Sequence, residues 1–251
     1  MQAFNKDNYI SLLKTIIEAG YSFRPFQILS SNIDQDIKSI ILLRHDVDAD
    51  MQAALEMAKI ENSLGVRSTY FFMFRSPIYN FMSRANSDIA QKIISLGHWV
   101  GIHYDYSYYQ GNTKTKLEWI QFESQMMSEL LGVRINTISF HQPDISIVNQ
   151  EVDTGDLINT YHHPFVNGFH YISDSNRIFK EPIHEVIIDK KYTRLQLLIH
   201  PMWWMYSHNS RVDVWNRVIT NNFCLMQEQL LKTERAYGSK RSIILGGDND
   251  A

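Results

Sequence analysis

The run Ile40-Ile41-Leu42-Leu43, followed directly by Arg44-His45-Asp46-Val47-Asp48, indicates the fold class of this chain. Consecutive apolar residues of this kind are typical of a strand buried on both faces, and adjacent charges rarely end such a strand without a reason. Because side chains alternate along an extended backbone, Asp46 and Asp48 point to the same side. Two carboxylates held this close need a cation, a shared proton or a set of hydrogen-bond donors. The alternative is a pair on a solvated turn that water alone stabilises.

Further along the chain, apolar runs alternate with segments of helical periodicity. Strands are predicted over residues 39–44, 68–74, 99–103, 137–140, 169–172, 195–199 and 242–245, and helices over residues 9–19, 50–64, 87–96, 113–131 and 212–231. Strands that are apolar on both faces and alternate with helices indicate a parallel sheet covered by helices. About seven strands are compatible with an open sheet or a barrel, and we expect an α/β fold of the distorted (β/α) barrel type, with the helices outside. Residues 142–169 are expected to be irregular.

The composition indicates a folded chain with a substantial core. Of its 251 residues, 44% are hydrophobic and 20% are charged, a composition typical of folded proteins and not of disordered ones. We expect one domain over residues 1–251, with residues 1–38 as an N-terminal helical extension. The net charge of −3 gives no general reason to bind nucleic acid or an anionic membrane. Cys224 is the only cysteine, so an intrachain disulfide is excluded.

The N-terminal segment carries Lys6 and Asp7 and lacks the basic and then apolar pattern of a signal peptide. No stretch approaches about 18 uninterrupted apolar residues, so we expect no membrane span. A cytoplasmic protein is therefore expected, while the oligomeric state stays open.

Chemically active side chains follow several of the predicted strands. They are Asp46 and Asp48 after the first strand, and then His103, His141, Asp174 and His200 after later ones. In a (β/α) barrel the reactive residues gather at the C-terminal ends of the strands. Carboxylates and imidazoles together suit zinc or a similar divalent ion, with groups left over for acid and base catalysis.

Four motifs occur in order along the chain. They are Asp46-Val47-Asp48, Gly97-His98-Trp99-Val100-Gly101-Ile102-His103, Tyr171-Ile172-Ser173-Asp174-Ser175 and Leu197-Leu198-Ile199-His200-Pro201. In these motifs the chain resembles the polysaccharide deacetylase superfamily, of the carbohydrate esterase type, which includes chitin-oligosaccharide and peptidoglycan N-deacetylases. The resemblance implies that Asp46 is a catalytic base, that Asp48 and His103 bind a metal, and that His200 protonates the leaving amine. It also implies that Asp174 holds His200 in the useful tautomer.

The chain departs from the family pattern at three positions. Ser107 stands where the family has its second histidine or serine ligand, and Tyr104 replaces the usual serine or threonine. His141-Gln142-Pro143 stands where the family has Arg-x-Pro. We expect His141 to be the third metal ligand, with Ser107 or Asp105 as the alternatives. Arg44 is a candidate for the orienting role of the missing arginine.

The resemblance implies a metal-dependent amidohydrolase. We expect it to remove an N-acyl group, acetyl by the resemblance, from a small-molecule or oligosaccharide amino-sugar substrate in surface-polysaccharide biosynthesis. The expected cofactor is zinc, with nickel, cobalt or manganese as alternatives. Tyr104 and Trp203 are expected to contact the sugar, whereas His98 is expected to face away from His103 and to be structural.

Two other functions are compatible with the sequence. One is hydrolysis of another carbon–nitrogen bond, such as an N-formyl group or a ureide, on the same fold. The other is a non-catalytic carbohydrate-binding scaffold, which the loss of the usual arginine and of the second histidine motivates.

Overall fold

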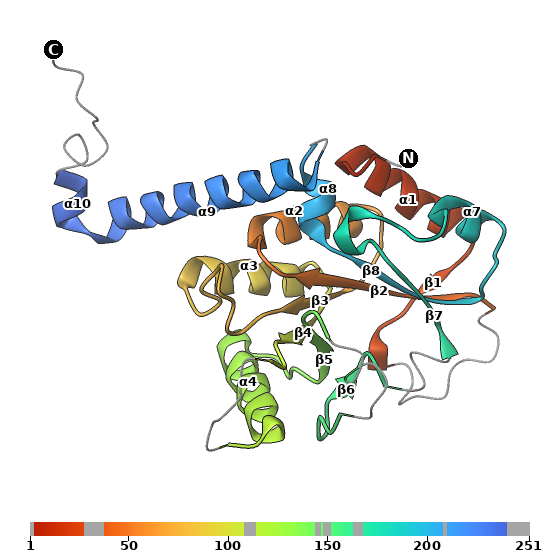
Figure 1. Cartoon of the computed structure of the whole chain (residues 1–251), viewed down its shortest axis with the longest axis horizontal. Helices are drawn as coiled ribbons and strands as arrows, with labels where there is room; N and C mark the ends of the chain where they lie inside the picture. Colours follow the sequence, from red (N-terminus) through yellow and green to blue (C-terminus); the bar gives the residue numbers. More distant parts are fainter. Residues whose placement is uncertain are drawn as a thin grey trace, which may run out of the picture.

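The computed structural model describes residues 3–27, 38–107, 114–143, 147, 152–162, 168–207 and 210–239 (Figure 1). The predicted strand at 242–245 lies outside these residues. The strands are β1 (Ser22–Phe23), β2 (Ile40–Val47), β3 (Thr69–Phe72), β4 (Trp99–Tyr104), β5 (Thr137–Phe140), β6 (Ile158–Asn159), β7 (His170–Ser173) and β8 (Arg194–Ile199). The helices are α1 (Lys6–Glu18), α2 (Met51–Ser63), α3 (Arg84–Ser95), α4 (Lys116–Leu131), η2 (Ser175–Arg177), α7 (Ile183–Ile188), α8 (Pro201–Met205), α9 (Arg211–Thr233) and α10 (Arg235–Ser239).

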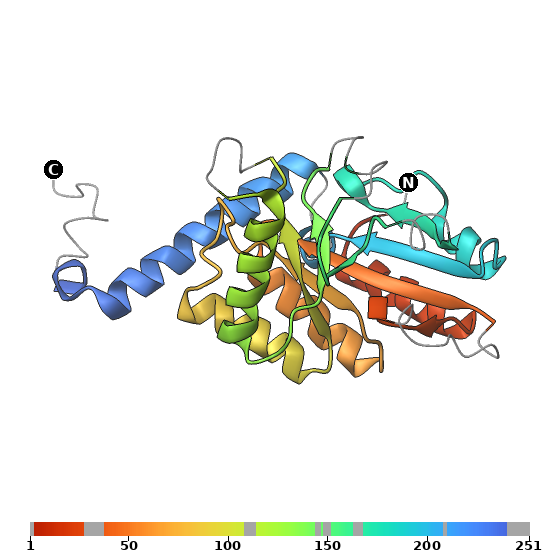
Figure 2. The same cartoon turned by 90° about the horizontal axis from the view of Figure 1, so that it is seen from below.

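The strands form one parallel sheet in the order β6-β5-β4-β3-β2-β8-β7, and β1 pairs with β2 beside this path. The sheet curls into a distorted (β/α) barrel with helices around its outside, as Figures 1 and 2 show, which confirms the predicted fold class. Among the described residues no ladder joins β7 to β6, so the barrel is open at that point. Strand β2 lies at the centre, between β3 and β8.

The side chains of β2 alternate between two cores. Ile41, Leu43 and Val47 belong to the large cluster formed with the outer helices. The intervening Ile40 and Leu42 belong to a smaller inner cluster with Phe26, Phe71 and Phe169. Since the period of a strand is two residues, Arg44 and Asp46 continue the inner row. The interior of the barrel therefore changes from apolar at the start of β2 to charged at its end, and the site described below lies there.

Gly101 in β4 lies where the side chains of β3 and β5 come close to its backbone. A Cβ atom at Gly101 would lie 2.4 Å from Cε1 of Phe71 and 2.6 Å from Oγ1 of Thr137. Only a residue without a side chain fits between these two neighbours, so β3, β4 and β5 can approach closely. Gly132 has another role, because its φ of 69° provides the left-handed C-cap of α4.

The N-terminal segment is packed onto the barrel. Tyr9, Leu12, Leu13 and Ile16 of α1 are fully buried, and the side chain of Asn5 caps the helix by accepting from the backbone N–H of Asn8 at 2.8 Å. Residues 1–38, predicted as a helical extension, thus also supply strand β1. None of the helices in the described ranges has the length and apolar character needed to cross a bilayer.

Candidate active site

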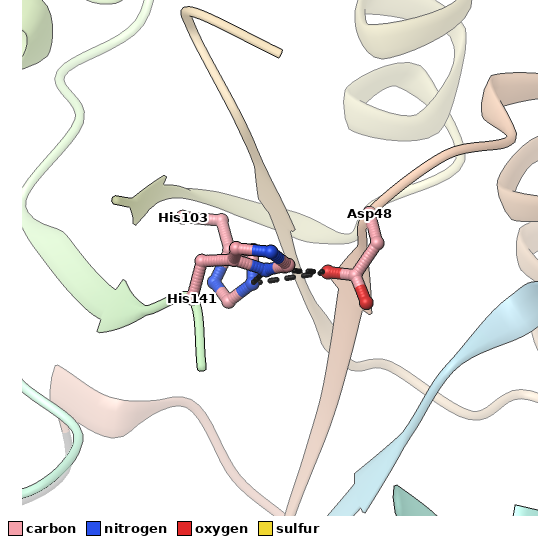
Figure 3. A group of neighbouring side chains, drawn as sticks. All are labelled: Asp48, His103 and His141. Atoms are coloured by element: carbon pink, nitrogen blue, oxygen red, sulfur yellow. Dashed lines mark hydrogen bonds and ion pairs between the residues drawn. The ribbon is translucent and has the colours of Figure 1, made fainter. Parts of the chain in front are cut away.

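Three of the predicted residues meet at the C-terminal ends of β2, β4 and β5. Oδ1 of Asp48 lies 3.1 Å from Nε2 of His103 and 3.3 Å from Nδ1 of His141, and the two imidazole nitrogens are 3.2 Å apart. Figure 3 shows both rings directed at the same carboxylate oxygen. The three side chains come from segments far apart in sequence, because the ends of parallel strands meet at one edge of the sheet.

The donor atoms of Asp48, His103 and His141 fit a divalent metal ion. All of them lie within 4.8 Å of one another. Three donors bound to one zinc ion at about 2.1 Å with tetrahedral angles stand about 3.4 Å apart, close to the distances observed here. Of the alternatives for the third ligand, Ser107 donates its hydroxyl to Oδ1 of Asp105 at 2.7 Å. The geometry therefore favours His141 over Ser107 and Asp105.

Ser139 orients His103, and the sequence prediction missed it. Its Oγ lies 2.6 Å from Nδ1 of His103 and 3.4 Å from Oδ1 of Asp46, to which it donates. In that arrangement the Nδ1–H of His103 donates to Ser139, and the lone pair of Nε2 faces Asp48 and His141. Such a contact fixes the ring and tautomer of a metal-binding histidine. Ser139 lies two residues before His141 on β5, so strand alternation could have identified it.

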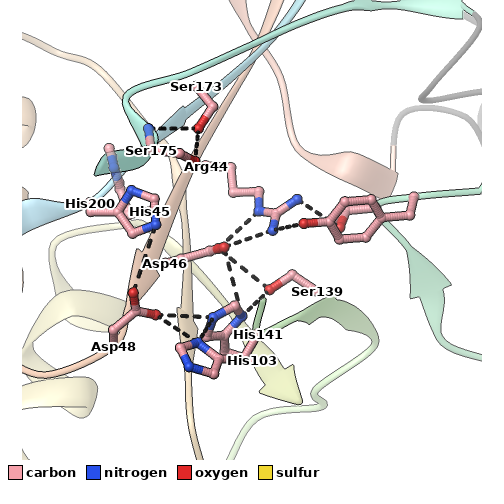
Figure 4. A network of polar contacts seen from close by, with 12 residues as sticks. Arg44, His45, Asp46, Asp48, His103, Ser139, His141, Ser173, Ser175 and His200 are labelled. Atoms are coloured by element: carbon pink, nitrogen blue, oxygen red, sulfur yellow. Dashed lines mark hydrogen bonds and ion pairs between the residues drawn. The ribbon is translucent and has the colours of Figure 1, made fainter. Parts of the chain in front are cut away.

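Arg44 and Asp46 form a buried ion pair inside the barrel (Figure 4). The guanidinium donates from Nε to Oδ1 at 2.9 Å and from Nη2 to Oδ2 at 2.7 Å, and the two side chains are 0% and 3% exposed. Thr160 and Tyr161 accept further hydrogen bonds from Arg44, each at 3.0 Å. Burial raises the pKa of Asp46, but the charge of Arg44 outweighs this effect and holds that pKa below its usual value.

His200, which follows β8, and Asp174, which follows β7, form a second ion pair. Nδ1 of His200 lies 2.6 Å from Oδ1 of Asp174, and the other carboxylate oxygen accepts from Nε1 of Trp204 at 2.8 Å. Nε2 of His200 points toward Asp48, whose Oδ2 is 3.8 Å away. Burial lowers the pKa of His200, but Asp174 and the other carboxylates raise it to about 9. These carboxylates therefore favour the protonated form of His200.

These groups share a cavity of about 330 Å³. Its lining consists of Asp46, Asp48, His103, Phe140, His141, Gln142, Pro143, Thr160, Tyr161, Tyr171, Ser175, Gln196, Leu198 and His200. The charged groups and the aromatic rings of Phe140, Tyr161 and Tyr171 thus line the same cavity. Sites of this kind, concave and largely apolar with a few convergent polar groups, are typical of small-molecule pockets.

Tyr104 and Trp203, predicted as sugar-binding residues, do not line this cavity. Tyr104 is 0% exposed and packs in the outer core, because the alternation that aims His103 inward turns its neighbour outward. Trp203 is 6% exposed and stands edge-on to Trp215, with ring centroids 6.0 Å apart. These placements contradict the predicted contact with a substrate, and Tyr161 and Tyr171 provide the aromatic walls instead.

His98 faces away from His103, as predicted, and belongs to a polar cluster behind the sheet. At its centre is Glu61 of α2, fully buried, with Oε1 2.6 Å from Nε2 of His45 and Oε2 3.5 Å from Nδ1 of His98. Ser68 and Tyr70 each donate a hydroxyl to Oε2 at 2.7 Å. Burial would raise the pKa of Glu61, but the imidazole of His45 and the other donors lower it to about 2.

Comparison with known proteins gives matches among solved structures. No protein-family model matches the chain, and a search of curated proteins finds no match. Among solved structures, the peptidoglycan deacetylase PdaC from Bacillus subtilis is 12% identical over 81% of this chain and 96% of its own, with a TM-score of 0.41. The chitin deacetylase from Colletotrichum lindemuthianum is 15% identical over 72% of this chain and 81% of its own, with the same TM-score.

BA3943 from Bacillus anthracis, described as a CE4 family pseudoenzyme, is 17% identical over 74% of this chain, with a TM-score of 0.42. This chain spans only 60% of the length of BA3943. At these identities and TM-scores the matches carry no argument, so the chemistry of this chain has to follow from its own residues.

Proposed function

We propose that this chain is a metal-dependent hydrolase that removes an N-acyl group, such as acetyl, from an amino sugar. The observation that carries the proposal is the convergence of Asp48, His103 and His141 within one cavity. Asp46 and His200 also line that cavity. The pKa of Asp46 is lowered, whereas the pKa of His200 is raised. A carboxylate kept ionised beside an imidazole kept protonated is the pairing that general base and general acid catalysis require.

Asp48, His103 and His141 would hold the metal ion, with zinc the first candidate and nickel, cobalt or manganese compatible with the same donors. A bound ion supplies Lewis acidity here, which polarises an acyl oxygen and lowers the pKa of water. All three residues line the cavity, so an ion held by them would be accessible to a substrate bound there. Such access is characteristic of catalytic metal sites.

Asp46 acts as the general base in this proposal. Arg44 fixes both carboxylate oxygens through two hydrogen bonds and keeps the group ionised, so it can accept a proton from water attacking the acyl carbon. Arg44 thereby takes the orienting role for which the sequence made it a candidate. Its planar, two-point contact defines the direction of the carboxylate as a lysine could not.

His200 acts as the general acid. Asp174 accepts from Nδ1, which leaves the proton on Nε2 directed into the cavity toward the departing amine. The carboxylate of Asp174 raises the pKa of His200, which favours the protonated ring that a general acid needs. The amide nitrogen is a poor leaving group unless it is protonated, so this proton transfer completes the cleavage.

The cavity supports an amino sugar as substrate. Its volume of about 330 Å³ is at the lower end for small-molecule pockets and suits one sugar ring with its acyl group. The rings of Tyr161 and Tyr171 offer apolar faces against which the C–H groups of a sugar can pack. Thr160 and Gln196 also line the cavity, where both accept hydrogen bonds from Arg44 and so help to hold it in place.

The test is the Asp46→Asn variant, assayed with N-acetyl and N-formyl amino sugars by release of acetate or formate. We expect the variant to retain its metal and to lose turnover by about 10²–10⁴-fold, the usual size of a general-base effect. Asp88→Asn, at an exposed carboxylate of α3, serves as the matched control and should keep full activity. Unchanged turnover in Asp46→Asn would exclude it as the base. Formate as the sole product would indicate the other carbon–nitrogen hydrolase, and a metal-loaded protein that releases neither acid would indicate a binding scaffold.

A further inference from the structure

Tyr161, which follows strand β6, is held at the wall of the cavity by contacts with its own chain. Its backbone N–H donates to Oδ1 of Asn159 at 2.9 Å, in an Asx turn that ends the strand. Its ring centroid lies 6.1 Å from that of Phe140 and 4.9 Å from Cζ of Arg44. Because the ring is already held in place, a contact between Tyr161 and a molecule in the cavity costs little conformational entropy.

The hydroxyl of Tyr161 carries a proton that no described residue accepts. Nη2 of Arg44 lies 3.0 Å from Oη, and a guanidinium only donates, so the hydroxyl is the acceptor in this hydrogen bond. A hydroxyl that accepts one hydrogen bond can still donate another. Within the described ranges, Oη makes no hydrogen bond besides the one from Arg44. Since Tyr161 lines the cavity, a molecule bound there can supply the acceptor.

This hydroxyl is a neutral donor that a positive charge polarises. Burial raises the pKa of Tyr161 above its usual value; Arg44 opposes this rise, and Asp46 adds to it. The phenol therefore keeps its proton at neutral pH. The hydrogen bond from the guanidinium draws electron density toward Oη and so strengthens the O–H group as a donor.

Arg44 sets the distance between this donor and the proposed general base. The same nitrogen, Nη2, donates to Oδ2 of Asp46 at 2.7 Å and to Oη of Tyr161 at 3.0 Å. Its two N–H bonds diverge by about 120° in the plane of the guanidinium, so the two oxygen atoms stand about 5 Å apart. The substituents of one sugar ring span such a distance. One substrate molecule can therefore present its acyl group to Asp46 and another group to Tyr161.

The substrate atom that meets this donor follows from the proposed function, on which this inference rests. In that proposal the acyl oxygen is polarised at the three-residue metal site, and the amide nitrogen receives the proton of His200. The acyl carbon is attacked by water that Asp46 activates. The polar atoms that remain for Tyr161 are the oxygens of the sugar, whose hydroxyl groups can accept a hydrogen bond.

We propose that the hydroxyl of Tyr161 donates a hydrogen bond to a hydroxyl oxygen of the amino sugar, and that Tyr161 selects substrates that carry this hydroxyl group. Arg44 then has two roles, because it fixes the general base through Asp46 and the recognition donor through Tyr161. A sugar that lacks the hydroxyl group leaves this donor unpaired in the cavity, which lowers the kcat/KM for that sugar.

The test compares acetate release from N-acetylglucosamine with that from its 3-, 4- and 6-deoxy analogues. We expect the wild type to lose about tenfold in kcat/KM with one of these analogues, the size of one hydrogen bond. Tyr161→Phe should lose about tenfold with the parent sugar and should no longer discriminate against that analogue, because both changes remove the same contact. Tyr192→Phe is the matched control. The hydroxyl of Tyr192 donates to Oε2 of Glu181 at 3.4 Å and does not line the cavity, so this variant should keep the kcat/KM values of the wild type.

The pH profile of kcat/KM separates a direct contact from an effect that passes through Arg44. If Tyr161 acted only by holding Arg44, Tyr161→Phe would slow the reaction of all four sugars by the same factor and would shift the acidic limb of the profile. That result, or a wild type that uses all four sugars equally well, overturns this inference and leaves the proposed function standing. A wild type that releases acetate from none of the four sugars would count against the proposed function itself, and this inference would fall with it.

Discussion

Replacement of Arg44 by methionine tests how strongly the interior of the barrel depends on its buried ion pair. The substitution leaves the Asp46 carboxylate, 3% exposed, without its cation and without two hydrogen bonds of 2.9 and 2.7 Å. Thr160 and Tyr161 also lose their donor. Removal of one partner from a buried pair costs about 3–5 kcal/mol, a large part of the roughly 5–15 kcal/mol that stabilises a domain.

The assay is urea denaturation followed by tryptophan fluorescence, with a chelator present so that metal binding does not contribute to stability. We expect Arg44→Met to lower the free energy of unfolding by about 3–5 kcal/mol. Arg44→Met/Asp46→Leu should regain much of this loss, because no unpaired charge stays buried. The control is Lys6→Met, which breaks a 3.0 Å pair with Glu56 whose side chains are 45% and 47% exposed and should change stability by less than about 1 kcal/mol. If Arg44→Met lowered the free energy of unfolding as little as Lys6→Met does, the Arg44–Asp46 pair would not have the stabilising role assigned to it.

Three further predictions address the surroundings of the site. Ser139→Ala should weaken zinc binding by about 10–100-fold, because it removes a contact that orients a metal ligand. The zinc affinities of variant and wild type are compared by competition titration, and equal affinities would show that Ser139 does not have this role. The folded pKa of Glu61, about 2, lies below its unfolded value of 4.5, so its stabilisation is present above pH 4.5 and is lost as the pH falls toward 2; this amounts to about 3 kcal/mol. Glu61→Gln should therefore show a flatter decline of unfolding free energy over that range, and a decline as steep as in the wild type would contradict the pKa. Tyr104→Phe should leave turnover and KM unchanged because the ring lies behind the sheet, whereas a raised KM would return it to the substrate site.

The charged end of β2 could be predicted because two simple rules apply to it. Alternation placed Asp46 and Asp48 on one face, and the common edge of a parallel sheet brought His103 and His141 to them. Both rules need only a strand and its direction, and the apolar run at Ile40–Leu43 supplies these. The register of β2 with β3 and of β4 with β5 then sets the distances, which no sequence pattern gives.

Other features of the site could not be predicted, for physical reasons. Strands β1 and β6 have two residues each, too few for any period to be read. Ser139 carries no charge and resembles any strand serine until His103 is placed beside it. Tyr104 was assigned to the substrate by its place in a motif, although alternation with His103 directs it to the outer core. Helix α8 begins at Pro201, the last residue of the late motif, and buries both Trp203 and Trp204.

Zinc titration of the metal-free chain tests the central claim most directly, since every proposed catalytic step depends on Asp48, His103 and His141 binding one ion. We expect a single site per chain in the wild type and no such site in Asp48→Ala or His141→Ala. His170→Ala is the control, because His170 also contacts a carboxylate, that of Glu181 at 2.6 Å, but lies outside the three-residue group. Binding that is lost in the first two variants and kept in the third is the predicted result. A site that persists in Asp48→Ala with unchanged affinity would contradict the account.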